Sequence, residues 1–321
     1  MSKTLIAAAL LAGLASTQTF AAESINFGII STESTANLKQ AWEPFLADMR
    51  KGTGLEIKAF FAPDYAGIIE GMRFNKVQVA WYGNKSAMEA VDRANGEIFA
   101  QTIAPDGSNG YYSLLVVHKD SPINSLDDVL ANKAKLQLGF GDPNSTSGTL
   151  VPGYYAFALN NVDPAKDFKR MVRANHETNL LAVSTKQVDV ATNNTENWGR
   201  FEKTHPEKIA QLRQVWKSPL IPSDPLVWRV DLDPKIKAKM SDFLLAYGKT
   251  DAREKQVLLN IGFAGFKPSN DDQLIPVRQI SLVKEKTKLL NNDKVAEADK
   301  ATRIAEIDKQ LAELAKRSIK D

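Results

Sequence analysis

The chain is 321 residues long, 43% hydrophobic and 25% charged, with a formal net charge of +3 and no cysteine. A chain of this length forms about two domains, and this composition supports an apolar core rather than a disordered chain. The nearly balanced charge, with no Lys/Arg block before the C-terminal region, argues against a nucleic-acid-binding surface. The absence of cysteine excludes disulfides and a lipid-bearing cysteine.

Residues 1–21 have the pattern of a signal peptide. Lys3 supplies the positive start, residues 5–15 form an apolar stretch too short to cross a bilayer, and residues 19–21 form a cleavage site. We therefore expect a mature chain that starts at Ala22, lies in the periplasm and carries no lipid anchor. No later segment is long and apolar enough to insert in a membrane.

Strand-like and helix-like stretches alternate after this leader. Strands are expected at 25–30, 55–61 and 77–81, and helices at 36–51, 66–74 and 85–94. This alternation is typical of a mostly parallel sheet with helices on both faces. A second series follows, with strands expected at 136–140, 168–173, 188–192 and 213–216.

Two segments interrupt the alternation and predict an α/β fold of two lobes. The β-branched run at 111–119 and the proline-bounded stretch at 218–222 are interpreted as two strand crossovers between the lobes. Lobe 1 would comprise residues 22–119 plus 221–283, and lobe 2 residues 120–220.

Residues 76–84 and 186–196 are similar, since each contains a strand that leads into a polar loop bearing asparagine. Ligands of open α/β sheets bind beyond the carboxyl ends of the strands. One such loop from each lobe would face the other across a cleft.

The stretch 284–321 is dense in charge, lacks glycine and proline, and is expected to form a C-terminal helix. It carries a narrow apolar stripe at 3-4-3 spacing, made of Ile304, Ile307, Leu311 and Leu314. Two interpretations remain open: the helix packs on its own lobe, or it pairs with a second copy in a homodimer.

Residues 139–148 read Gly-Phe-Gly-Asp-Pro-Asn-Ser-Thr-Ser-Gly, between a short apolar strand and a helix-like stretch. Ser145, Thr146 and Ser147 lie where the helix should begin, and free backbone N–H groups there favour an anion. The segment contains no Lys or Arg, so hydrogen bonds would hold the anion. An ordinary helix N-cap would have the same composition.

Other polar groups follow predicted strands or turns. His176 lies at a strand-to-helix turn, Glu196 and Asp224 lie in loops after strands, and Tyr65 and Tyr111 follow turns marked by proline or glycine. Each of these residues taken alone is explained equally well by a structural histidine, a solvated carboxylate or a core aromatic ring.

A hydrolase triad of Ser145 or Ser147 with His176 and Asp224 is the alternative from another functional class. The sequence does not support it, because neither serine lies in a Gly-x-Ser-x-Gly elbow. The sequence also offers no His/Cys cluster for a metal and no P-loop lysine.

Five longer motifs resemble the phosphonate-binding protein of the phosphonate ABC importer: residues 27–34, 62–69, 142–148, 191–197 and 216–222. The resemblance implies a type II periplasmic binding protein, whose two lobes close on a small molecule and deliver it to a membrane permease and its ATPase. It implies no catalytic residue, no cofactor and no metal.

The resemblance also implies roles for single residues toward 2-aminoethylphosphonate. Its phosphonate end would be held by Tyr65, Ser145, Thr146, Ser147 and His176. Its amine end would be held by Tyr111, Glu196 and Asp224. A receptor for phosphite or phosphate is the alternative within binding proteins, and two carboxylates would be of no use to such an anion.

Overall fold

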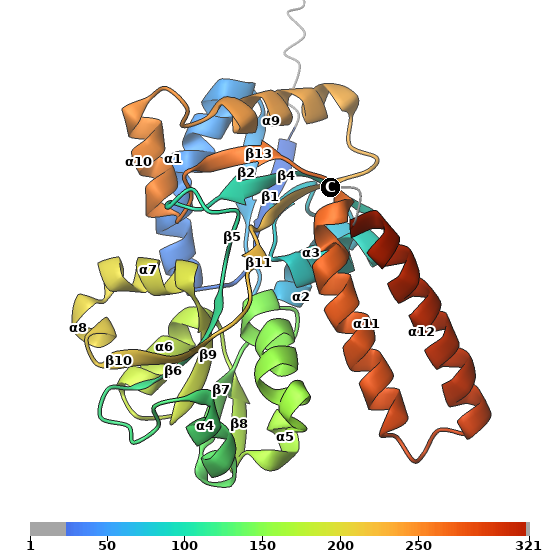
Figure 1. Ribbon diagram of the computed structural model, residues 1–321. Coiled ribbons are helices and arrows are strands. Elements are labelled where there is room, and N and C mark those ends of the chain that lie inside the picture. Colours follow the sequence, from blue (N-terminus) through green and yellow to red (C-terminus); the bar gives the residue numbers. More distant parts are fainter. Residues whose placement is uncertain (1–23, 319–321) are drawn as a thin grey trace, which may run out of the picture.

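The computed structural model describes residues 24–318, which form two α/β lobes and a projecting helical hairpin (Figure 1). The expected signal peptide at residues 1–21 lies outside the described residues. Among residues 24–318, no helix has both the length and the apolar character needed to cross a membrane.

The first lobe contains a six-stranded sheet in the order β13-β4-β12-β3-β1-β2. Its strands are β1 (Ser24–Ile29), β2 (Glu56–Phe60), β3 (Val79–Trp81), β4 (Gly96–Ile103), β12 (Pro225–Arg229) and β13 (Gly265–Pro268). The helices of this lobe are α1 (Thr35–Thr53), α2 (Tyr65–Arg73), α3 (Asn84–Arg93), α9 (Pro234–Ala246) and α10 (Ala252–Asn260).

The second lobe contains a five-stranded sheet in the order β10-β6-β9-β7-β8. Its strands are β6 (Ser113–His118), β7 (Gln137–Phe140), β8 (Arg170–Arg173), β9 (Val190–Asn194) and β10 (Leu212–Lys217). Its α-helices are α4 (Leu126–Asn132), α5 (Pro164–Asp167), α6 (His176–Ser184), α7 (Thr195–Thr204) and α8 (Pro206–Ile209). The helix expected after residue 148 begins with wide π-helical turns at Thr146–Leu150 and Gly153–Phe157.

Two short strands, β5 (Gly110–Tyr111) and β11 (Ile221–Pro222), pair antiparallel where the chain passes between the lobes (Figure 1). They lie close to the two predicted crossovers. β6, which the expected boundary at residue 119 assigns to lobe 1, instead pairs with β9 and β10 in the second sheet. We therefore propose that the first crossover lies at residues 104–112 rather than after residue 119.

Both sheets are mixed, which corrects the expectation of mostly parallel sheets. β1 pairs parallel with β2 and β3. β12, which follows the segments of lobe 2 in the chain, lies between β3 and β4 and pairs antiparallel with both. β4 and β13 were absent from the predicted strands. Their pairing depends on segments more than 120 residues apart in the chain, which local patterns do not reveal.

The core of lobe 1 includes a cluster of aromatic rings between its sheet and α1. The ring centroids of Trp42 and Trp81 are 5.2 Å apart, and those of Trp81 and Phe263 are 5.7 Å apart. Such contacts add stabilisation beyond apolar burial. Trp81 also reaches the edge of the cleft, so this cluster connects the core to the cleft.

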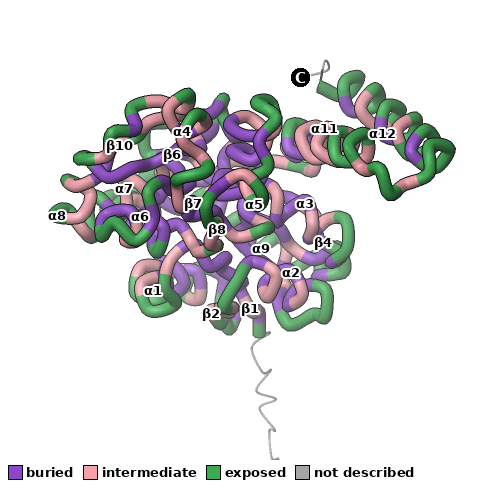
Figure 2. The backbone as a smooth tube through the Cα atoms, turned by 90° about the horizontal axis from the view of Figure 1, so that it is seen from below, coloured by how far each residue is buried: buried purple, intermediate pink, exposed green. Residues whose placement is uncertain are grey.

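The C-terminal stretch forms two helices, α11 (Ile275–Leu290) and α12 (Glu297–Ser318), rather than the single helix expected from residue 284. The helix breaks at Asn291, and the side chain of Asn292 accepts a hydrogen bond from the Lys294 N–H, because asparagine competes with helical hydrogen bonding. α12 packs on α11 and is otherwise largely exposed (Figure 2). Its stripe residues Ile307 and Leu314 are thus buried within the chain itself.

Candidate ligand-binding site

A small cavity lies between the lobes, at the carboxyl ends of β1, β2, β3, β7, β8 and β9. This is the position at which open α/β sheets bind ligands. All the predicted site residues line it: Tyr65, Tyr111, Ser145, Thr146, Ser147, His176, Glu196 and Asp224.

The hydroxyl turn begins the helical stretch that follows β7. Ser145 is its N-cap, and the Ser145 hydroxyl accepts a hydrogen bond of 2.9 Å from the Gly148 N–H. The Gly141 N–H donates to the Gly148 carbonyl at 3.0 Å, and a Cβ on Gly141 would lie only 2.5 Å from the Gly148 Cα. The glycines that bracket the segment are therefore required for this tight turn.

The N-cap interpretation of the turn is confirmed, because Ser145 caps a helix. Ser145 also lines the cavity, where a bound anion would contact it. The Ser147 hydroxyl accepts from the Asn194 amide at 3.0 Å, and the Thr146 hydroxyl accepts from the Lys85 N–H at 2.8 Å. The three hydroxyls are thus oriented by neighbours from β9, from the N-terminus of α3 and from their own turn.

His176 is the first residue of α6 and is buried beside the hydroxyl turn. Its Nε2 lies 3.4 Å from the Ser145 hydroxyl, 3.5 Å from the Ser147 hydroxyl and 3.2 Å from the Asn194 amide nitrogen. Burial, together with the charge of Arg200, lowers the pKa of His176 to about 3. The imidazole is therefore neutral near pH 7, and this end of the cavity offers uncharged donors.

Tyr65 is the first residue of α2, whose N-cap Asp64 accepts from the Gly67 N–H. The Tyr65 side chain is buried in the cavity wall, and burial raises the pKa of its phenol. Because the phenol stays protonated, it can donate a hydrogen bond into the cavity.

The other end of the cavity is acidic. The Tyr111 hydroxyl donates to the Asp224 carboxylate at 2.9 Å, and Glu196 lies in the first turn of α7. Burial raises the pKa of Glu196 to about 7. Burial and the nearby charge of Glu196 raise the pKa of Asp224 well above its usual range. Two enclosed carboxylates near each other resist joint ionisation unless a cation joins them.

Arg200 is a cavity residue that the sequence reasoning missed. It lies one turn after Glu196 on α7, and its Nε donates to the Glu33 carboxylate at 2.6 Å. Burial is the largest influence on Arg200 and lowers its pKa, but Glu33 and Glu196 outweigh it and raise the pKa overall. The spacing of Glu196 and Arg200 at i,i+4 was the available signal, although such pairs usually lie on exposed helix faces.

Among the described residues, no group of three or more His, Cys, Asp and Glu side chains is arranged to hold a metal ion. Several buried polar atoms of the cavity-lining residues make no hydrogen bond to any described residue, namely Thr32 Oγ1, His176 Nδ1 and Arg200 Nη1. Buried polar groups usually have partners, so unpaired atoms on residues that line the cavity are consistent with a site for a polar ligand.

Comparisons with known proteins agree with this geometry. Residues 27–274 match the family of periplasmic phosphonate substrate-binding proteins of ABC transporters. The chain is 60% identical over 292 residues to the phosphonates-binding periplasmic protein of Escherichia coli K12, covering 91% of this chain and 86% of the relative.

Solved structures show the same fold. A binding-protein component of an ABC phosphonate transporter from Pseudomonas aeruginosa aligns with a TM-score of 0.90 and 58% identity, covering 94% of this chain and 99% of that one. A Prochlorococcus marinus protein in complex with methylphosphonate aligns with a TM-score of 0.73 and 21% identity, covering 82% and 98%, and so shows the fold alone.

These findings confirm the type II periplasmic binding protein fold and the phosphonate family expected from the sequence. The protein binds phosphonates in the periplasm for ABC import, and it is a substrate-binding protein rather than the hydrolase considered as an alternative. The chain belongs to the periplasmic phosphonate-binding proteins of ABC transporters.

Proposed function

We propose that the preferred ligand is 2-aminoethylphosphonate, held with its two ends in chemically different halves of the cavity. The phosphonate lies against Tyr65, Ser145, Thr146, Ser147 and His176, and the ammonium lies against Tyr111, Glu196 and Asp224. The observation that carries this proposal is the acidic end: two buried carboxylates with raised pKa values face the same enclosure as a set of neutral donors.

The energetics favour a zwitterion. Each charge-assisted hydrogen bond to the phosphonate contributes roughly 1.5–3 kcal/mol, so three or four suffice for micromolar binding, which needs about 8 kcal/mol. An ammonium group enclosed without a partner would cost several kcal/mol. Glu196 and Asp224 remove that cost, whereas phosphite and phosphate have no positive group for them to meet.

The test is titration calorimetry with 2-aminoethylphosphonate, methylphosphonate, phosphite and phosphate. The substitutions Glu196→Gln and Asp224→Asn keep the shape of each side chain and remove its charge. We expect each to weaken 2-aminoethylphosphonate by at least tenfold and methylphosphonate by much less. Glu202→Gln, an exposed change on the same helix, is the matched control. Equal losses for both ligands, or tighter binding of phosphate than of either phosphonate, would remove the amine assignment.

Two finer predictions accompany this function. Removal of residues 1–21 on export is checked by N-terminal sequencing of the mature protein, which should begin at Ala22.

Pairing of two chains through the C-terminal helix is checked by the mass in solution before and after truncation at Lys300. An unchanged mass would show that this helix does not pair two chains.

A further inference from the structure

Arg200 belongs to lobe 2, but its guanidinium is enclosed by lobe 1. Its partner Glu33 follows β1, and each of the two side chains is only 12% exposed. A Cβ placed on Gly262, in the loop between α10 and β13, would lie 2.9 Å from the Arg200 Nη1. The guanidinium therefore lies between two loops of the opposite lobe, and opening of the cleft would separate it from both.

Two further contacts join a carboxylate of lobe 2 to the start of a lobe 1 helix. The Glu177 carboxylate of α6 accepts from the Ser34 N–H at the start of α1, at 2.8 Å. Asp142 accepts from the Tyr65 N–H at the start of α2, at 3.2 Å. In each case an acidic side chain of lobe 2 meets the positive end of a lobe 1 helix, where free N–H groups need acceptors.

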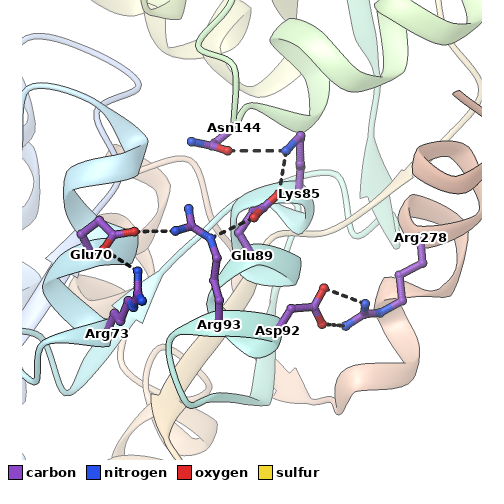
Figure 3. Close-up of polar contacts among 8 residues, drawn as sticks. All are labelled: Glu70, Arg73, Lys85, Glu89, Asp92, Arg93, Asn144 and Arg278. Atoms are coloured by element: carbon purple, nitrogen blue, oxygen red, sulfur yellow. Dashed lines mark hydrogen bonds and ion pairs between the residues drawn. The ribbon is translucent and has the colours of Figure 1, made fainter. Parts of the chain in front are cut away.

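The third helix is α3, whose Lys85 N–H donates to the Thr146 hydroxyl at 2.8 Å. The Lys85 side chain also reaches across to Asn144 at 3.4 Å and is held by Glu89 at 3.1 Å (Figure 3). Glu89 in turn pairs with Arg93, which bonds Glu70 on α2. Contacts within lobe 1 thus hold the Lys85 side chain in the position from which it reaches lobe 2.

We propose that Glu33 and Arg200, together with the helix-capping residues Asp142, Thr146 and Glu177, form an interlobe latch that sets how tightly the closed protein retains its ligand. Glu33, Asp142 and Glu177 are positioning residues, because their contacts join the lobes rather than a ligand. The latch contacts form on closure and break on opening, so they slow ligand release. The inference rests on phosphonate binding by the family and does not depend on the proposed preference for an amine.

The experiment compares Glu33→Gln and Glu177→Gln with the wild type, using methylphosphonate and 2-aminoethylphosphonate as probes. Stopped-flow tryptophan fluorescence gives association and release rates. Because the chain has no cysteine, Lys51→Cys and Lys135→Cys place one fluorophore on each lobe and report closure by energy transfer. Arg253→Gln, which breaks an ion pair with Asp48 inside lobe 1, is the matched control.

For Glu33→Gln we expect a Kd raised roughly 30-fold for both probes, mainly through faster release, as is found when one partner of a buried charge pair is removed. The closed fraction at saturation should fall, and the melting temperature of the ligand-free protein should stay unchanged. An unchanged Kd, or a lower ligand-free melting temperature with normal closure, would overturn the latch. Equal behaviour of the two probes in the wild type would weaken only the amine assignment.

Discussion

The acidic end of the cavity predicts that discrimination between phosphonates depends on pH. The pKa of Glu196 rises from 4.5 to about 7, so ionising this carboxyl in the cavity costs about 3 kcal/mol more than ionising it in water. An ammonium group favours the ionised form, whereas a methyl group leaves the carboxyl protonated below about pH 7. Binding of the aminated ligand therefore releases a proton relative to binding of methylphosphonate.

The expected size of the effect follows from this pKa. The ionised fraction of Glu196 in a complex without the ammonium falls about tenfold from pH 8 to pH 6, so the preference for 2-aminoethylphosphonate should weaken by about tenfold over that range. Each dissociation constant is first corrected for the fraction of the ligand that is dianionic, because the ammonium lowers the second pKa of the phosphonate to which it is attached and methylphosphonate has no such group. Asp224, whose pKa is also raised, can only steepen the dependence.

The assay is the ratio of the two dissociation constants, measured by calorimetry at several pH values. Repeating each titration in buffers of different ionisation enthalpy counts the protons released. Glu196→Gln should flatten the dependence. A ratio that stays constant between pH 6 and pH 8 in the wild type would refute the reasoning, because it would mean that Glu196 is ionised in both complexes.

Three substitutions give further tests. Gly110→Ala would place a Cβ 2.0 Å from the Ile221 carbonyl oxygen in the crossover ribbon, so we expect thermal unfolding to show a loss of about 1–3 kcal/mol. Gly199→Ala in α7, where nothing lies within 4 Å, should be neutral or stabilising, and equal effects at both positions would contradict this view of the ribbon. His176→Gln should weaken methylphosphonate about tenfold at every pH from 5 to 8, since the histidine is neutral throughout; a loss confined to low pH would show instead that it binds as a cation.

The sequence predicted the cavity residues because their signals are local. Ser145 and His176 each lie at the start of a helical stretch a few residues after a strand, and the carboxyl ends of parallel strands meet at one edge of a sheet. Glu196 follows β9 in the same way. The assignment of these residues to the two ends of a ligand came from the family resemblance, since spacing alone does not say which loops face each other.

The features that were missed depend on contacts distant in sequence. β4 pairs with β12, a strand that follows lobe 2 in the chain, so the position of β4 in the sheet depends on a distant segment. Arg200 resembles an ordinary exposed helix charge, and its burial depends on Glu33, 167 residues away. The absence of glycine and proline predicts an unbroken helix over this stretch, but asparagine also ends helices, and the break lies at Asn291.

The charge distribution of the cavity also fixes the orientation of a zwitterionic ligand. A ligand placed backwards would bring a phosphonate dianion against Glu196 and Asp224, and its ammonium against hydroxyls and a neutral His176. Like charges enclosed together cost several kcal/mol, far more than any hydrogen bond regained at the other end. The positive charge of Arg200 reduces the energy difference between the two orientations, but Arg200 is already paired with the Glu33 carboxylate.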